Sequence, residues 1–113
     1  MSTAAGQLAE AAAAEYLRDL GYEILERNWR TRWCEIDIIA AKDGTAHFIE
    51  VKYRRTPSAG TGLSYITPAK LKRMAFAAEL WRTVAGWSGD SELGAVELSG
   101  IPPVVDSFIA ELT

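Results

Sequence analysis

Residues 34–54 read CEIDIIAAKDGTAHFIEVKYR, and this stretch decides the fold. Asp43-Gly44 lies between two runs of largely apolar residues. An Asp-Gly pair in that setting is a strong hairpin signal, because a type I′ turn needs positive φ at both central positions. The pattern predicts antiparallel strands over 34–42 and 45–54. One face of the pair is mostly apolar and is expected in the core: Ile36, Ile38, Ala40, His47, Ile49 and Val51.

The register of this hairpin brings carboxylates together on the other face. With the two-residue loop, Asp37 lies directly opposite Glu50, and Glu35 lies opposite Lys52. Directly opposed side chains have Cβ atoms about 5 Å apart, and like charges so placed destabilise a sheet unless something compensates them. A divalent cation is the natural compensator. A solvated face with a Glu35 to Lys52 ion pair is the alternative, but it leaves the opposition of Asp37 and Glu50 unexplained.

Length and composition predict one globular domain over residues 1–113, with a motif-bearing core over 3–98 and a tail over 99–113. A chain of 113 residues with 49% hydrophobic content suffices for one core and is too short for two ordinary domains. No apolar run approaches the roughly 20 residues that span a bilayer. The single cysteine agrees with a reducing compartment. We therefore expect a cytoplasmic protein that does not contact membranes.

The charge is unevenly distributed. The net charge is −3, yet residues 27–82 carry eleven basic and five acidic side chains, while both flanking segments are acidic. The basic segment contains the carboxylate hairpin, and a basic rim around an acidic floor is the arrangement that a phosphodiester needs. Trp33 and its neighbouring arginines could also stack on unpaired bases. Candidate nucleic-acid contacts are Arg30, Arg32, Arg54, Arg55, Lys70 and Arg73.

Other local signals predict the remaining elements. A helix is expected over 4–20, with Leu8, Ala12, Tyr16 and Leu20 on one stripe and Gly21 after its end. Strands are expected over 22–29 and 94–98, a loop over 56–65, and a strand or short helix over 104–112. Thr67-Pro68 is a good N-cap and first-turn pair for a helix that runs to Val84. Its inward positions are expected to be Leu71, Met74, Ala75, Ala78 and Trp81.

Several motifs accompany the hairpin in order along the chain: Gly6-Gln7, residues 21–28 (GYEILERN), residues 35–37 (EID), residues 48–54 (FIEVKYR) and Lys70. In order, spacing and residue type over residues 3–85, the sequence resembles the bacterial YraN-like family of predicted endonucleases. That family belongs to the PD-(D/E)xK restriction-endonuclease-like superfamily and is similar in outline to archaeal Holliday-junction resolvases. The resemblance implies an α/β fold with an α-β-β-β-α-β core, in which helices flank a central mixed sheet.

The resemblance also implies roles for single residues. By it, Asp37 and Glu50 are metal-ligand positions and Lys52 is the catalytic lysine. The family usually has a glutamate where this chain has Gln7, at a position that helps bind metal or water. Glu10, one helical turn further on, is the other candidate for a carboxylate there.

Phosphodiester chemistry suggests the cofactor, Mg²⁺ or Mn²⁺. Mg²⁺ is usually bound through one or two carboxylates plus phosphate oxygens. The carbonyl of Val51 is expected to add a third protein oxygen to those of Asp37 and Glu50. Three roles stay open for Lys52: to orient the attacking water, to deprotonate it, or to stabilise the transition state as a cation. Glu35 either holds Lys52 or binds a second, weaker metal.

The sequence therefore predicts a metal-dependent endonuclease that acts on DNA rather than RNA, with branched or structured DNA as a candidate substrate. Two alternatives stay open. The first is a catalytically weak or inactive nucleic-acid-binding module on a nuclease fold. The second is a protein-docking domain whose carboxylates form a structural ion cluster. A homodimer is also left open.

Overall fold

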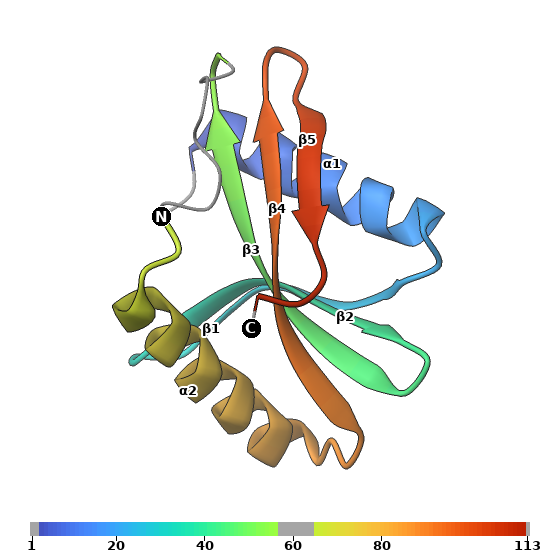
Figure 1. Cartoon of the computed structure of the whole chain (residues 1–113), viewed down its shortest axis with the longest axis vertical. Coiled ribbons are helices and arrows are strands. Elements are labelled where there is room, and N and C mark those ends of the chain that lie inside the picture. The colour runs from blue at the N-terminus through green and yellow to red at the C-terminus, as the bar shows by residue number, and fades with distance from the viewer. Residues whose placement is uncertain (1–2, 57–64, 113) are drawn as a thin grey trace.

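A five-stranded mixed sheet forms the centre of the protein, with one helix on each face (Figure 1). The computed structural model describes residues 3–56 and 65–112, so most of the loop expected over 56–65 lies outside it. The strands lie in sequence order, with β3 parallel to β4 and the other neighbours antiparallel. The elements are α1 (Ala4–Asp19), β1 (Glu23–Arg30), β2 (Glu35–Lys42), β3 (Thr45–Arg54), α2 (Pro68–Ala85), β4 (Asp90–Ser99) and β5 (Val104–Ile109).

The predicted α-β-β-β-α-β order is confirmed, and β5 follows as a strand rather than a short helix. Helix α2 makes the crossover that the parallel pairing of β3 and β4 requires. It begins as expected, with the Thr67 side chain accepting the Lys70 N–H at 3.1 Å and Pro68 in the first turn. It ends before Gly86, which has a φ of 69°. Neither helix of the described part combines the length and apolar character that a membrane-spanning segment needs.

The hairpin between β2 and β3 has the predicted turn and register. Asp43 and Gly44 have φ values of 51° and 80°, and the register runs from Lys42 opposite Thr45 to Ile38 opposite Ile49. Both faces of this hairpin are buried, however, and not one alone. Under α1 lie Ile38, Ala40, Ile49, Val96 and Leu98; under α2 lie Ile36, Ile39, Ala46 and Phe48.

The sheet divides where the pairing of β2 with β3 ends, at Ile38 and Ile49. Beyond that point β2 stays paired with β1 as far as Glu35, while β3 stays paired with β4 as far as Arg54. We call this point the fork. The predicted opposition of Glu35 and Lys52 is therefore wrong, because the two residues follow different partner strands. Asp37 is the first residue of β2 beyond the paired part of the hairpin.

The buried face of α1 differs from the predicted stripe. Leu8 and Leu20 are 62% and 42% exposed, whereas the side chains that pack on the sheet are Ala9, Ala13, Ala14 and Leu17. Small alanine side chains let the helix lie close to the sheet. On α2, Met74, Ala78 and Trp81 are buried as predicted, but Ala75 is exposed and Ala77 is buried in its place. Tertiary contacts therefore determine which surface of each helix covers the sheet, and the local sequence pattern predicted these surfaces only in part.

Candidate functional site

Asp37 lies at the fork, and its carboxylate bridges the two separating strands. Its Oδ2 accepts the backbone N–H of Val51 at 2.8 Å. The pKa of Asp37 is raised to about 7, mainly by burial and next by the negative charge of Glu50, while the hydrogen bond from the Val51 N–H lowers it. Smaller increases come from Glu10 and Glu35. Asp37 is thus a buried carboxyl group within the influence of other carboxylates. The predicted pairing of Asp37 directly opposite Glu50 is not part of the observed register, which ends at Ile38 and Ile49.

Glu10 brings a carboxylate from α1 toward the same point. It is only 7% exposed, and its Oε1 is buried without a hydrogen-bond partner among the described residues. Gln7, one turn earlier, is exposed to solvent. Of the two candidates on α1, Glu10 is therefore the one placed beside Asp37. Its spacing from Ala13, Ala14 and Leu17 is the helical signal that could have identified it.

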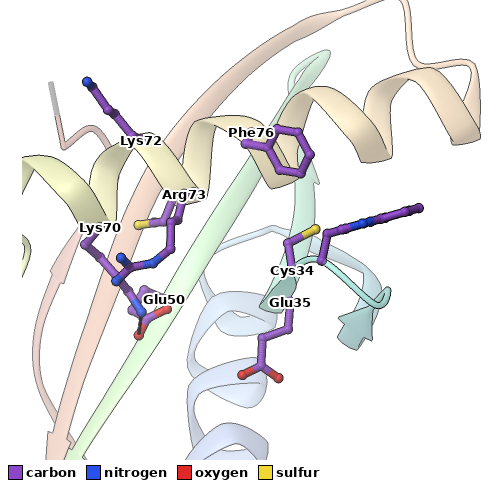
Figure 2. Close-up of a pocket in the computed structure, with 9 residues that line it drawn as sticks. Cys34, Glu35, Glu50, Lys70, Lys72, Arg73 and Phe76 are labelled. Atoms are coloured by element: carbon purple, nitrogen blue, oxygen red, sulfur yellow. Dashed lines mark ion pairs between the residues drawn. The ribbon is translucent and has the colours of Figure 1, made fainter.

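Glu50, on β3, is held by a lysine from α2. The Nζ of Lys70 lies 3.0 Å from Oε2 of Glu50, with both side chains partly buried. Figure 2 shows Lys70 and Arg73 extending from α2 toward Glu50, while Lys72 points away. Lys70, a predicted nucleic-acid contact, thus neutralises a predicted metal ligand in this structure.

Lys52 lies two residues beyond Glu50 on β3, and its ammonium group lies near an aromatic ring. Its Nζ is 5.7 Å from the ring centroid of Tyr65, and the guanidinium of Arg54 is 5.8 Å from the same ring. The Tyr65 hydroxyl is buried without a partner among the described residues, and burial raises its pKa. Sequence reasoning missed Tyr65. Glu35 lies apart from Lys52, 3.9 Å from Arg30 in an exposed ion pair.

The remaining predicted nucleic-acid contacts are divided between two regions. Arg54 is 3.2 Å from the nearly buried Glu97, which also accepts a 2.8 Å hydrogen bond from Ser107. Arg55 lines a separate, mainly apolar cavity with Tyr53 and residues of α1 and the turn after β4. Arg30 and Arg32, by contrast, lie in or beside the turn between β1 and β2.

A cavity of about 400 Å³ joins this turn to the start of α2. Figure 2 shows Glu35 and Glu50 on the sheet side and basic side chains on α2. Anionic and cationic groups therefore share one concave surface, as a site that binds both a metal ion and a phosphate requires. Its lining residues are Trp33, Cys34, Glu35, Glu50, Lys70, Lys72, Arg73, Met74 and Phe76.

The residues at the fork fit a metal ion that keeps several of its own ligands. Within residues 3–56 and 65–112, no group of three or more Asp, Glu, His or Cys side chains is arranged so that it could hold a metal ion by itself. Mg²⁺ does not need one, because it retains waters and is completed by substrate phosphate. Burial and nearby carboxylates raise the pKa of Asp37, and Oε1 of Glu10 is buried without a hydrogen-bond partner among the described residues, so both carboxyl groups have oxygens that lack full compensation. A divalent cation would supply this compensation.

Comparison with known proteins agrees with these motifs. A model of the uncharacterised protein family UPF0102 matches residues 9–98, a range that includes Glu10, Asp37, Glu50 and Lys52. A UPF0102 protein of Chlorobium chlorochromatii is 42% identical over 91 residues, covering 80% of this chain and 70% of that protein. One of Mycolicibacterium vanbaalenii is 43% identical over 76 residues, covering 67% and 63%. One of Syntrophomonas wolfei is 42% identical over 81 residues, covering 72% and 70%. The chain belongs to the UPF0102 family, the YraN-like family that its motifs resemble.

Proposed function

We propose that this protein is a metal-dependent endonuclease that hydrolyses DNA phosphodiester bonds, with branched or otherwise structured DNA as its substrate. The observation that supports this most is the charge environment of Asp37. Burial first, and then the charges of carboxylates from β3 and α1, raise the pKa of Asp37 at the fork to about 7. Groups whose pKa values depart this far from normal gather at functional sites, and Glu50, whose charge acts on Asp37, lines a cavity with a basic wall.

Asp37 and Glu50 would hold Mg²⁺ or Mn²⁺, with Glu10 and the carbonyl of Val51 as further oxygen donors. When bound, such an ion lowers the pKa of a coordinated water and neutralises charge that develops on the phosphate. The contribution of the protein is to hold these carboxylates in place. Asp37 is held by the Val51 N–H, Glu50 is fixed by the paired strands β3 and β4, and Glu10 is fixed by the packing of α1.

Two lysines would serve the phosphate. Lys52 lies two residues beyond Glu50, so its ammonium can hold an anionic oxygen or orient the attacking water near the carboxylates. Lys70 pairs with Glu50 at 3.0 Å. Once a cation neutralises Glu50, Lys70 is free to turn to a phosphate oxygen, and Arg73 lies beside it on the same wall. We also propose a cytoplasmic location, where a DNA substrate would be met.

The test is a cleavage assay on labelled single-stranded, duplex and four-way-junction DNA, with Mg²⁺, with Mn²⁺ and with chelator. The proposal predicts cleavage that requires the metal and is lost in Asp37→Asn, which preserves the size and hydrogen-bonding oxygen of the side chain. Absence of cleavage on every substrate would contradict it. Cleavage retained in Asp37→Asn would contradict the site.

One observation favours a second candidate, a nucleic-acid-binding module with little or no catalysis. Glu50 is already neutralised by Lys70, and the described carboxylates do not form a closed metal site. This candidate predicts DNA affinity that falls steeply with added salt, because lysine and arginine contacts release condensed counterions, but no hydrolysis. A protein-docking domain would show neither property.

A further inference from the structure

Two aromatic rings stand in solvent at the cavity that contains Glu50. Trp33 is 69% exposed and Phe76 is 54% exposed, and both line this cavity. They are the exposed aromatic side chains among residues 3–56 and 65–112; the other rings there are buried or half-buried. Large apolar side chains left in water next to a charged cavity indicate a contact surface.

Both rings are presented by rigid backbone. The turn between β1 and β2 is closed by a hydrogen bond from the Thr31 N–H to the Cys34 carbonyl at 2.8 Å. The Trp33 N–H also donates to the Thr31 hydroxyl at 3.1 Å, and this holds the residue outward. Phe76 projects from α2 near Cys34 (Figure 2). Rings held in this way lose little conformational freedom when they bind a flat partner.

One ring has a cation over it, and the other follows two basic residues on its helix. The guanidinium of Arg32 lies 5.5 Å from the centroid of the Trp33 ring, and Lys72 and Arg73 precede Phe76 on α2. A basic surface with exposed aromatic rings is the combination that binds single-stranded nucleic acid, because phosphates contact the cations while bases stack on the rings. The cavity that the exposed residues Leu8 and Ile101 line has no exposed ring. Charge complementarity therefore favours a nucleic-acid strand at Trp33 and Phe76.

We propose that Trp33 and Phe76 form a stacking site for unpaired bases of a DNA strand. The cavity runs from these rings to Glu50, so a strand held there extends along Lys70 and Arg73 toward the carboxylates. In a duplex the faces of the bases are covered by their neighbours, so an intact duplex cannot use the rings. This inference rests on the proposed function, because the proposed function supplies the cleavage of the bound strand. It specifies the substrate as DNA with an unpaired segment.

The test is a binding titration of the full chain in chelator, read by the anisotropy of labelled oligonucleotides. Three probes are matched in length: a single strand, its duplex, and a single strand with abasic sites that keeps the phosphates and lacks the bases. Trp33→Leu with Phe76→Leu keeps apolar bulk but removes the stacking faces. Trp33→Phe keeps a ring, and Val84→Ala changes another exposed apolar side chain, 70% exposed, further along α2.

The wild type should bind the single strand more tightly than the duplex or the abasic strand. The double leucine variant should lose about tenfold or more of the single-strand affinity, since stacking stabilises each bound base considerably. Its affinity for the duplex and the abasic strand should not change. Val84→Ala should bind like the wild type, and Trp33→Phe, which keeps a ring at this position, should retain most of the single-strand affinity that the double leucine variant loses.

Equal affinity of the wild type for the single strand and the abasic strand would overturn the stacking site, as would unchanged single-strand binding in the double variant. Tighter binding of an RNA strand of the same sequence would overturn the assignment to DNA. Because no metal is present, this experiment is independent of hydrolysis. An active nuclease that binds without the rings refutes the inference alone, and base-dependent binding without cleavage refutes the proposed nuclease alone.

Discussion

Asp37 Oδ2 lies 2.8 Å from the backbone nitrogen of Val51, at the point where β2 leaves β3. This hydrogen bond satisfies a backbone donor beyond the last residue pair of the hairpin. The same carboxylate is opposed by burial and by the charge of Glu50. Asp37 therefore stabilises the fork through one interaction and destabilises it through its charge, and each effect can be measured.

The pH dependence of the free energy of unfolding should show that the negative charge of Asp37 destabilises the folded protein. In the unfolded chain Asp37 ionises near 3.8, and in the folded protein it ionises near 7. Between these values the folded protein keeps a proton that the unfolded chain has lost. In chelator, the contribution of Asp37 to the free energy of unfolding therefore falls as pH rises, by up to roughly 1.4 kcal/mol per pH unit.

The side chain at position 37 cannot titrate in Asp37→Asn. The free energy of unfolding of this variant relative to that of the wild type should therefore rise from pH 4 to pH 7, and above pH 7 the variant should be the more stable protein. Urea unfolding of both proteins at a series of pH values measures the difference. Parallel curves for the two proteins would show that Asp37 ionises normally in the folded state.

Glu10→Gln should reduce the stabilisation gained from Mn²⁺, because it removes a buried carboxylate that acts on Asp37. Stabilisation by a ligand follows its affinity for the folded state, so the shift in unfolding temperature on adding Mn²⁺ is the measurement. Gln7→Glu is the matched control. It adds a carboxylate one turn away on the exposed side of α1 and should leave the shift unchanged. A larger shift in Gln7→Glu than in the wild type would show that position 7 can supply a metal-binding carboxylate from α1.

Lys70→Met should strengthen Mn²⁺ binding and weaken DNA binding, because it frees Glu50 and removes a cation from the cavity wall. The variant should lose roughly 1 kcal/mol or less of stability in chelator, since the pair is partly exposed. Lys72→Met removes the same charge from a side chain that points away from Glu50 (Figure 2). Equal Mn²⁺ affinities in the two variants would show that the Lys70 ion pair does not compete with metal.

Arg54→Met should destabilise the protein by an amount on the order of 3 kcal/mol, because it leaves the nearly buried Glu97 without its cation. Urea unfolding measures this loss. Arg55→Met, at the adjacent exposed position, should change stability by roughly 0.5 kcal/mol or less. Combining Arg54→Met with Glu97→Leu should recover part of the loss. If Arg54→Met is as stable as Arg55→Met, Arg54 is available to bind DNA instead.

Local signals in the sequence predicted the parts of the fold that depend on neighbours in the chain. The Asp43-Gly44 turn set the hairpin register, and Thr67-Pro68 marked the start of α2. The fork could not be predicted in this way. Pair counting assumes that two strands stay together, whereas β2 and β3 each follow a different partner beyond Ile38 and Ile49. That choice depends on strands distant in the sequence.

The residues of the candidate site also differ in whether local sequence signals could predict their contacts. Asp37 and Glu50 each lie next to the last pair of the hairpin, Ile38 with Ile49, so the turn predicted that these two carboxylates would influence each other, although not that the strands separate between them. Glu10 was left as one of two candidates, because an alanine-rich helix offers little contrast between its faces. The contacts of Lys70 with Glu50 and of Lys52 with Tyr65 depend on how α2 and the segment before it lie against the sheet. No local pattern encodes them.

The proposed function requires that the carboxylates at the fork bind a divalent cation. Calorimetric titration of Mn²⁺ into the wild type, Asp37→Asn and Gln7→Glu measures this binding. We expect one site in the wild type, an equal site in Gln7→Glu, and loss of binding in Asp37→Asn. The same Mn²⁺ affinity in the wild type and Asp37→Asn would contradict it.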